Sequence, residues 1–335
     1  MSIMDDTAEE TEKKDVILLA LEPDTLPEEQ LDRVRDVVPD NKELLVTRDR
    51  DVIEAVIDEI EIAAGWFPRS LLPRASNLRW FQQWAAGADW LLRHPEAVEM
   101  DFVLTNMSGI HAIPVSEHVF ALLLAFAREL SPALRAQQHR KWIPYDQHQH
   151  LFELANKTML LIGVGAIGER TAQVAAAMGV RVLGIRRDPT VGATGVDTMH
   201  GPDQLHDLLP QADFVVLTVP LTPETQGMIG EQELRAMKPT AHLINVGRGG
   251  VVDEDALLHG LRQGWIAGAG LDVLETEPLP EDSPLWELDN MIITSHYAGV
   301  TPHYHERALR VFRDNLERYH AGLPLQNVVE KTLGY

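Results

Sequence analysis

The segment Thr158-Met-Leu-Leu-Ile-Gly-Val-Gly-Ala-Ile-Gly168 decides the fold of this chain. Its first five residues are mostly apolar, as in a buried strand, and an Ala-rich helix is expected to follow over Thr171–Met178. Between them, Gly163 permits a tight turn, Gly165 lets the backbone approach a pyrophosphate, and Gly168 allows close packing of helix on strand. The helix N-terminus would then face the phosphates. The segment therefore predicts a dinucleotide-binding βαβ unit, with a ligand-free tight turn as the alternative.

The end of the next expected strand, Gly184-Ile-Arg-Arg-Asp188, bears on which dinucleotide binds. An acid about 20 residues after the fingerprint hydrogen-bonds the ribose 2′-OH of NAD, and Asp188 is a candidate for that acid. A strand of six residues from Val180 instead places Arg186 at the strand tip, and guanidinium groups pair with a 2′-phosphate through bidentate bonds. Arg186 and Arg187 therefore favour NADP(H); NAD(H) is the weaker alternative, and a solvated basic turn is the other. Further cofactor contacts are expected from Ala166, Ile167, Val219 and Pro220.

Apolar runs alternate with helical stretches on both sides of this unit, a pattern typical of open parallel sheets. In the C-terminal part the expected strands number six, at 158–162, 180–185, 214–218, 242–246, 266–271 and 291–294. In the N-terminal part the runs lie at 15–21, 44–46, 60–65, 78–84 and 102–105. We also expect a long buried helix over Val115–Leu130, an irregular polar arm over residues 131–150, and a returning helix from about Thr301 to His320.

The fold class that follows is α/β, with two Rossmann-like, doubly wound parallel-sheet domains and a cleft between them. The substrate-binding domain is expected to comprise residues 1–114 and 302–335, and the dinucleotide-binding domain residues 115–301.

Three side chains near the C-terminal end carry the expected chemistry. Arg248 lies in Asn-Val-Gly-Arg-Gly-Gly, Glu277 in Glu-Thr-Glu-Pro, and His296 in Thr-Ser-His-Tyr-Ala-Gly. A guanidinium matches the carboxylate of a 2-keto acid, and an imidazolium can protonate the keto oxygen as hydride arrives. Free His has a pKa near 6.5, so it is only partly protonated at neutral pH, and an adjacent carboxylate favours the imidazolium. Beside a dinucleotide site these residues predict hydride transfer to a 2-keto acid; taken singly, each is also compatible with an ordinary surface or core residue.

Composition limits the class of protein. The 335 residues suffice for two domains of ordinary size. The chain has no cysteine, which excludes disulfides, zinc–thiolate sites and a catalytic thiol, and we expect no metal site. The first residues are acidic and lack an apolar run, so we expect no signal peptide and a cytoplasmic protein.

The charge of the chain is unusual. A net charge of −22 accompanies 7 lysines and 22 arginines. Dispersed acidity argues against nucleic acids and anionic membranes as partners. Few lysines with many acids resemble haloarchaeal proteins, so we expect adaptation to a salt-rich cytoplasm; a moderately acidic mesophilic enzyme is the alternative.

Taken together, the motifs resemble those of the D-isomer-specific 2-hydroxyacid dehydrogenases, and the resemblance covers most of the chain. Beside the fingerprint and the three segments above, the matching motifs are Trp84-Ala-Ala-Gly-Ala-Asp89, Asn106-Met-Ser-Gly-Ile110, Val115-Ser-Glu-His118, Val219-Pro-Leu-Thr-Pro-Glu-Thr225 and Leu271-Asp-Val-Leu274. Within the family the sequence looks closest to glyoxylate/hydroxypyruvate reductases, which tend to use NADPH. Formate dehydrogenases resemble it less, because they pair their His with Gln where this chain has Glu277.

The resemblance implies roles for the matched positions. Arg248 binds the substrate carboxylate, and His296 is the acid/base that Glu277 assists. The backbone N–H groups of Gly87 and Ala88 hold the same carboxylate, and Asp272 hydrogen-bonds the nicotinamide carboxamide. The resemblance also implies a homodimer joined through the coenzyme domains, with Val115–Leu130 and the arm at the contact.

Aromatic residues near these motifs bear on substrate size. Trp66 and Phe67 follow an expected strand end at Gly65, and Tyr297 adjoins His296. We predict that Trp66 and Tyr297 line an apolar substrate pocket for 2-keto acids longer than pyruvate; the alternative is that these aromatics belong to the core. The expected function is the reversible reduction of 2-keto acids to D-2-hydroxy acids with NADPH. The alternative is a dinucleotide-sensing module without turnover, like the corepressors that keep this fold.

Overall fold

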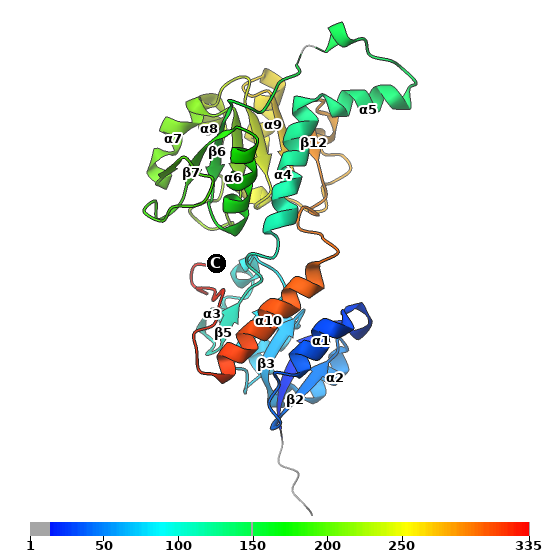
Figure 1. The fold of residues 1–335 in the computed structure, drawn as a ribbon, viewed down its shortest axis with the longest axis vertical. Helices are drawn as coiled ribbons and strands as arrows, with labels where there is room; N and C mark the ends of the chain where they lie inside the picture. Colours follow the sequence, from blue (N-terminus) through cyan, green and yellow to red (C-terminus); the bar gives the residue numbers. More distant parts are fainter. Residues whose placement is uncertain (1–13, 149, 335) are drawn as a thin grey trace, which may run out of the picture. The chain divides into compact units, whose positions relative to one another are not determined.

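The computed structural model describes residues 14–148 and 150–334, and the chain divides into two compact units (Figure 1). The first unit comprises the chain up to Ser108 and the segment from Pro302 onwards, and the second runs from Gly109 to Thr301. The sequence placed the first division at 114/115. The structure divides earlier, where helix α4 begins at Ala112 and packs against α6, β10 and β11 of the second unit.

The first unit is built on a five-stranded parallel sheet in the order β2-β1-β3-β4-β5. Its strands are β1 (Asp15–Ala20), β2 (Lys42–Val46), β3 (Ile60–Gly65), β4 (Trp80–Gln83) and β5 (Val103–Thr105). Its α-helices are α1 (Glu28–Arg35), α2 (Arg50–Ala55), α3 (Glu96–Glu99) and α10 (Tyr304–His320). Short 3-10 helices are η1 (Pro23–Thr25), η2 (Ile57–Glu59), η3 (Arg69–Arg74) and η4 (Asp89–Leu92).

Helix α10 belongs to this unit although it is the last helix in the sequence. It lies beside α1 on one face of the sheet (Figure 1). Its buried residues Leu309, Phe312 and Leu316 recur at helical spacing. The ring of Phe312 stacks on Trp80 of β4 with centroids 5.4 Å apart. The helix therefore joins the first core through an apolar stripe, as its sequence pattern predicts.

The second unit contains a seven-stranded parallel sheet in the order β12-β11-β10-β9-β6-β7-β8. Its strands are β6 (Thr158–Ile162), β7 (Arg181–Ile185), β8 (Thr198–His200), β9 (Phe214–Leu217), β10 (His242–Asn245), β11 (Gly268–Leu271) and β12 (Met291–Ile293). The expectation of six strands was therefore wrong by one. Strand β8 was missed because Thr198-Met-His200 is a short edge strand without an apolar run; it pairs only with β7.

The α-helices of the second unit are α4 (Ala112–Ala127), α5 (Leu130–Gln138), α6 (Ala166–Ala177), α7 (Leu205–Leu208), α8 (Glu231–Ala236) and α9 (Glu254–Gln263). Its 3-10 helices are η5 (Tyr145–Gln147), η6 (Pro202–Gln204), η7 (Leu209–Gln211), η8 (Gly249–Val251) and η9 (Pro284–Glu287). The expected single helix 115–130 is divided at Glu129, whose φ of 49° interrupts the helical backbone. The first turns of the expected irregular arm are therefore helical, in α5, which buries no residue.

Strand β6 explains why the fingerprint strand is apolar throughout. Leu160 and Ile162 belong to one buried cluster, whereas Met159 and Leu161 belong to another. Successive side chains of a strand point to opposite faces, so both faces of this central strand are covered. Among the described residues, no helix combines the length and apolar character needed to cross a membrane, and no group of three His, Cys, Asp or Glu is arranged as metal ligands.

Candidate active site

The candidate cofactor residues gather at one edge of the seven-stranded sheet. Strand β6 pairs with β7 on one side and with β9 on the other, so the strand order reverses at β6. In open α/β sheets, ligands bind beyond the carboxyl ends of the strands at such a point. Gly163 follows β6, Arg186 follows β7, and Val219 follows β9 by two residues. The topology therefore brings together segments that the sequence separates by more than fifty residues.

The three fingerprint glycines are required for different reasons. A Cβ on Gly163, whose φ is +99°, would lie 2.7 Å from Val219 Cγ1, and one on Gly168 would lie 2.5 Å from Gly163 O. Protein packing alone therefore excludes a side chain at both positions. A Cβ on Gly165 would meet nothing within 4 Å. This glycine keeps open the space in front of α6, whose N-terminus has no side-chain cap, and a pyrophosphate fits that space by charge and by hydrogen bonding.

The structure places the two arginines of the second strand as the sequence predicted. Strand β7 ends at Ile185, so Arg186 is the first residue beyond it, half-buried, and Arg187 is exposed. Asp188 lies two residues further on, and its carboxylate accepts hydrogen bonds from Thr190 N (3.0 Å) and Thr190 Oγ1 (2.5 Å). These bonds hold the pKa of Asp188 below its usual value. Asp188, the acid that would bind the ribose 2′-OH of NAD, is thus hydrogen-bonded within its own turn.

His296 and Glu277 form a direct pair. The Nδ1 atom of His296 lies 2.7 Å from Glu277 Oε2, and the other carboxylate oxygen of Glu277 accepts Leu274 N–H at 2.9 Å. His296 has a φ of 53°, in the left-handed region that non-glycine residues seldom adopt. Its backbone N–H donates to Asp272 O at 2.8 Å. Because Nδ1 faces the carboxylate, Nε2 is the nitrogen available for proton transfer.

Arg248 lies beyond the carboxyl end of β10, which β11 separates from β12. It follows β10 in an extended conformation, and Asn245 Nδ2 donates to its carbonyl oxygen at 2.9 Å. Its guanidinium donates to Gly247 O at 2.7 Å, and the side chain is half-buried. Strands β10, β11 and β12 are adjacent, so Arg248 and His296 extend from the same edge of the sheet as the fingerprint.

The remaining predicted residues are placed less uniformly. Val219 is half-buried, Pro220 is exposed, and Ala166 and Ile167 form the first turn of α6. Asp272 is only 2% exposed. Its carboxylate accepts the backbone N–H groups of Tyr297 (3.1 Å) and Ala298 (2.9 Å). Asp272 therefore also supports the turn that carries His296, a contact that sequence reasoning did not anticipate.

The candidate residues of the first unit lie after strands β3 and β4. Trp66 is 47% exposed, whereas Phe67 is 1% exposed and packs edge-on against Phe81 at 5.9 Å. The core alternative therefore holds for Phe67. Gly87 and Ala88 lie in the loop after β4, where Gln83 Nε2 donates to Gly87 O at 2.7 Å. On the second unit, Tyr297 is 49% exposed.

Comparison with known proteins identifies the family. Residues 120–298 match the family described as D-isomer specific 2-hydroxyacid dehydrogenase, NAD binding domain. A glyoxylate reductase of Korarchaeum cryptofilum is 35% identical over 310 residues, which cover 90% of each chain. This chain belongs to the D-isomer specific 2-hydroxyacid dehydrogenases. The coenzyme-binding unit is therefore a nicotinamide-dinucleotide domain, and the protein is an oxidoreductase of this family.

Solved structures resemble this dehydrogenase over nearly its whole length. A 2-hydroxyacid dehydrogenase of Xanthobacter autotrophicus in complex with NADPH and MES gives a TM-score of 0.81 at 30% identity, covering 97% of this chain and 100% of its own. An NADPH-dependent glyoxylate/hydroxypyruvate reductase of Sinorhizobium meliloti, solved with NADP and sulfate, gives a TM-score of 0.80 at 27% identity, covering 96% and 100%. The two parallel-sheet domains expected from the sequence are thus confirmed.

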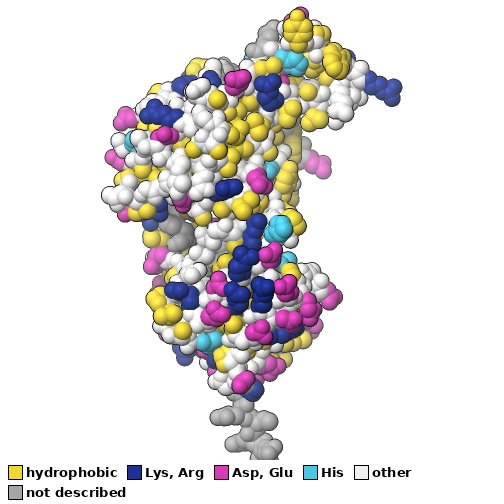
Figure 2. Space-filling view, viewed as in Figure 1, with side chains coloured by type: hydrophobic (Ala, Val, Ile, Leu, Met, Phe, Trp, Pro, Cys, Tyr) yellow, Lys and Arg dark blue, Asp and Glu magenta, His cyan; other side chains and the backbone are white. Residues whose placement is uncertain are grey.

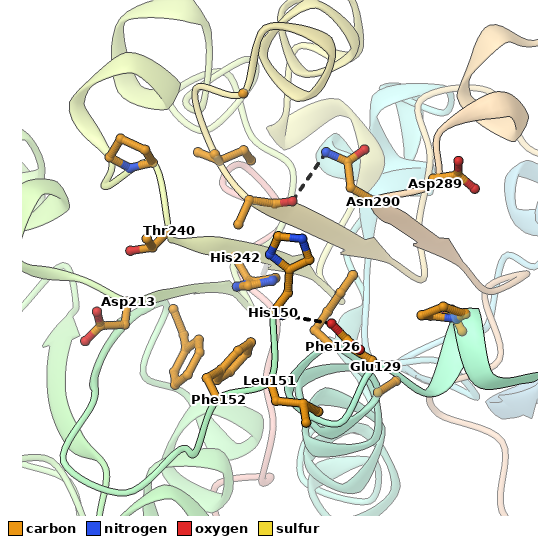
Figure 3. Close-up of a pocket in the computed structure, with 18 of the residues that line it drawn as sticks. Phe126, Glu129, His150, Leu151, Phe152, Asp213, Thr240, His242, Asp289 and Asn290 are labelled. Atoms are coloured by element: carbon orange, nitrogen blue, oxygen red, sulfur yellow. Dashed lines mark hydrogen bonds between the residues drawn. The ribbon is translucent and has the colours of Figure 1, made fainter. Parts of the chain in front are cut away.

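A pocket of about 690 Å³ in this dehydrogenase lies away from the candidate active site. Figure 3 shows Phe126, Phe152 and His242 turned into it. His242 is the first residue of β10 and Phe214 the first of β9, so the pocket borders the amino-terminal edge of the sheet. The candidate coenzyme residues lie at the opposite, carboxyl edge. The pocket therefore belongs to a different surface and needs a separate explanation.

Sequence reasoning missed several residues around the pair His296–Glu277. Thr294 donates to Asp272 Oδ1 at 2.6 Å, and His118 Nε2 lies 2.9 Å from Thr294 Oγ1. Glu254 Oε1 accepts Glu275 N–H at 2.5 Å. His118 stood in a quoted motif without a role, and nothing in the sequence indicated which elements these side chains would meet.

Proposed function

We propose that this dehydrogenase reduces 2-keto acids to D-2-hydroxy acids with NADPH, and catalyses the reverse reaction. The observation that carries the proposal is the hydrogen bond between His296 Nδ1 and Glu277 Oε2 at 2.7 Å, on the sheet edge where Arg248 also lies. An imidazole held in this way has one nitrogen against a carboxylate and the other free for a substrate oxygen. Relatives named glyoxylate reductase support the substrate class.

His296 would act as the acid in reduction. The nicotinamide, when bound, supplies the hydride. As charge develops on the keto oxygen, His296 Nε2 donates a proton to it, and Glu277 stabilises the imidazolium before transfer. In the reverse direction the neutral imidazole takes the proton from the hydroxyl group. General acid catalysis of this kind is worth about 10²–10⁴-fold in rate.

Arg248 would bind and orient the substrate. Its guanidinium fits a carboxylate through two parallel bonds. Gly87 and Ala88 of the first unit would add backbone N–H donors to the same carboxylate, as the family resemblance implies. Asp272 would accept a bond from the nicotinamide carboxamide in addition to its bonds within the turn.

NADP(H) is the coenzyme that we propose. Arg186 and Arg187 follow β7 directly, whereas Asp188 is engaged by Thr190. Two guanidinium groups attract a 2′-phosphate and gain little from a 2′-hydroxyl. The relatives from Sinorhizobium meliloti and Xanthobacter autotrophicus were solved with NADP and NADPH. NAD(H) would be used less well.

The substrate would carry an apolar chain beyond C2. Trp66 and Tyr297 are each about half exposed, at 47% and 49%, although aromatic rings of this size are usually covered. We propose that they contact unbranched aliphatic 2-keto acids longer than pyruvate.

A homodimer would explain the exposed arm. Within its described residues, Leu134, Trp142 and Tyr145 are 60%, 92% and 91% exposed. Figure 2 shows hydrophobic side chains on its surface. We propose that the arm of a second copy covers the pocket at Phe126, Phe152 and His242. Large exposed apolar groups on a protein surface mark an interaction site.

Polar groups support the same pairing of arm and pocket. The arm carries Arg140 and Lys141 against one acid, Asp146, besides Arg135, which already pairs with Asp289 of its own chain at 3.5 Å. Beside Asp289, the pocket is lined by the acids Glu129 and Asp213 and by Lys157. His242 is 7% exposed and its Nδ1 finds no hydrogen-bond partner among the described residues. The indole N–H or the phenol of a second arm offers a donor of the kind that this nitrogen lacks.

The oligomeric state tests this pairing. Wild type is expected to elute as a dimer in sizing chromatography, and W142A/Y145A as a monomer. A Q137A/Q138A variant, which alters the arm without its aromatic groups, should remain dimeric. A monomeric wild type, or a dimeric W142A/Y145A variant, would remove the proposed contact.

Turnover separates the dehydrogenase from the dinucleotide-sensing module that is its alternative. The assay is a panel of C2 to C8 2-keto acids with NADPH and with NADH, at low and high KCl. R248A and H296A should each lower kcat/KM by at least about 10²-fold, or roughly 2.7 kcal/mol. Full activity in H296A would remove the mechanism, and no turnover by wild type on any keto acid, with tight NADPH binding, would favour the sensing module.

A further inference from the structure

Helix α4 and its N-cap residue contact the turn that carries His296 through two imidazoles. His111, the N-cap, and His118 are seven residues apart, about two helical turns, and so face the same side. A Cβ added to Gly299 would lie 2.9 Å from His111 Cδ2. The rings of His118 and Tyr297 meet edge-on with centroids 5.3 Å apart. The segment 294–299 is therefore packed against this face of the helix.

A chain of hydrogen bonds runs from His118 into the turn. Thr294 Oγ1 donates to Asp272 Oδ1 at 2.6 Å, so the only hydrogen of this hydroxyl is committed to the carboxylate. His118 Nε2, 2.9 Å from the same oxygen, must then be the donor. This fixes the tautomer with the proton on Nε2. The same nitrogen lies 3.6 Å from Asp272 Oδ1.

Asp272, which accepts the last of these hydrogen bonds, also holds the turn itself. Asp272 is 2% exposed and accepts Tyr297 N–H and Ala298 N–H with its side chain, and His296 N–H with its backbone carbonyl. Three consecutive N–H groups thus end on one residue. A left-handed backbone such as that of His296 costs about 1–2 kcal/mol in an L-residue, so the conformation depends on such support.

His118 has the protonation state that this series of hydrogen bonds needs. Burial lowers its pKa, although the nearby Asp272 opposes the shift. At neutral pH the imidazole is therefore neutral and can carry its single proton on Nε2.

We propose that His118 is a positioning residue for His296, acting through the Thr294 hydroxyl and the Asp272 carboxylate. By donating to Thr294 it directs the hydroxyl hydrogen at Asp272 and keeps the carboxylate turned to the N–H groups of Tyr297 and Ala298. The backbone of His296 then stays in the conformation that presents Nδ1 to Glu277. The inference rests on the acid/base role proposed for His296.

The experiment uses substitutions that separate the hydrogen bond from the volume of the side chain. H118L removes the donor, whereas the amide N–H of H118Q can reach Thr294 in place of Nε2–H. T294V removes the hydroxyl at nearly constant shape. H259L is the matched control, because His259 of α9 packs edge-on against Trp265, at 5.1 Å, and makes no contact with segment 294–299 that the structure records. Each variant is assayed for kcat, KM and the pH dependence of reduction, with NADPH and the keto acid that wild type reduces best.

H118L and T294V should each lower kcat by about tenfold, since misplacement of an acid by a fraction of an ångström weakens proton transfer. Both should move the pH profile of reduction to lower pH, in the direction expected when the pair His296–Glu277 loosens. H118Q and H259L should retain the wild-type profile. The double variant H118L/T294V should be no worse than either single variant, because both break one chain.

A purely structural role would lower the thermal midpoint and leave the pH profile unmoved, and that result would overturn the inference. Multiplicative losses in the double variant, or an H118Q variant as impaired as H118L, would also overturn it. H296A separates the role of His118 from the role of His296. If H296A is inactive while H118L and T294V behave as wild type, only the role of His118 is wrong; if H296A is active, the proposed mechanism fails first.

Discussion

Gly249 lies so close to Leu274 that a Cβ on the glycine would stand 1.9 Å from the carbonyl carbon of Leu274. Gly249 follows Arg248, and Leu274 begins the loop that leads to Glu277. The carboxylate of Glu254 then fixes the next residue of that loop by accepting Glu275 N–H at 2.5 Å. The loops that bear the guanidinium and the carboxylate are therefore held against each other by backbone contact, which only glycine permits.

A methyl group at this contact should separate the two loops. We expect G249A to lower kcat/KM strongly and to destabilise the protein by about 1–3 kcal/mol or more, the usual cost of overpacking. G250A is the control, because its Cβ would meet only the Leu221 side chain, at 3.3 Å. Steady-state kinetics and thermal unfolding of both variants measure the effect. Equal behaviour of G249A and G250A would contradict the role given to the contact.

The pair His296–Glu277 predicts a pH dependence. Reduction needs the imidazolium, and in E277Q that cation loses the carboxylate now 2.7 Å from its Nδ1. The proton is then lost more easily, so the pH profile of ketone reduction should move to lower pH while the reverse reaction gains at lower pH. The measurement is kcat/KM for reduction between pH 5 and 9. A profile that stays in place would assign Glu277 a role other than electrostatic support.

The arginines after β7 predict a change in coenzyme use. R186A/R187A should raise KM for NADPH by at least about tenfold, since a charge-assisted contact is worth roughly 1.5–3 kcal/mol, and should leave NADH kinetics little changed. R181A, an exposed arginine at the start of β7, is the control. A wild-type enzyme that prefers NADH would show that no 2′-phosphate is bound here.

His242 predicts a loss of stability in mild acid. Burial lowers its pKa to about 4, whereas the unfolded chain titrates near 6.5. Between these values the unfolded chain binds the proton more readily than the folded protein does. The free energy of unfolding is therefore unaffected by His242 above about pH 6.5 and falls as the pH drops to about 4, by up to roughly 3 kcal/mol. H242F keeps an aromatic ring at this position and removes the group that titrates. Unfolding midpoints from pH 4 to 7 should fall less steeply in H242F than in wild type or in H259F.

The net charge of −22 predicts a response to salt. Acidic side chains repel one another across a compact chain, and at about 1 M salt the Debye length shortens to about 3 Å. The thermal midpoint and the proposed dimer should therefore both gain stability as KCl rises from about 0.1 M to above 1 M. Surface ion pairs such as Arg33–Glu29, at 2.6 Å, act in the opposite direction. A thermal midpoint that is unchanged or falls with KCl would contradict the expected adaptation to high salt.

Most strands of the two sheets were predictable because they contain short apolar runs, and a central strand such as β6 is covered on both faces. Strand β8 was not predictable, since Thr198–His200 is polar and exists only through its pairing with β7. The helical start of the arm was not predictable either, because α5 buries no residue and its sequence therefore lacks a periodic apolar face.

The sequence by itself determined the fingerprint turn and the place of Arg186 at the tip of β7. It also singled out Arg248, Glu277 and His296 as candidates, because a cation, a carboxylate and an imidazole each have a characteristic chemistry. Only the tertiary structure decided which partners these groups meet. The bond from Thr294 to Asp272, the approach of His118 from α4 and the contact of Gly249 with Leu274 join residues from separate strands and helices. Such contacts arise from sheet order and helix packing, which place distant segments within hydrogen-bonding range, and no local pattern encodes those distances.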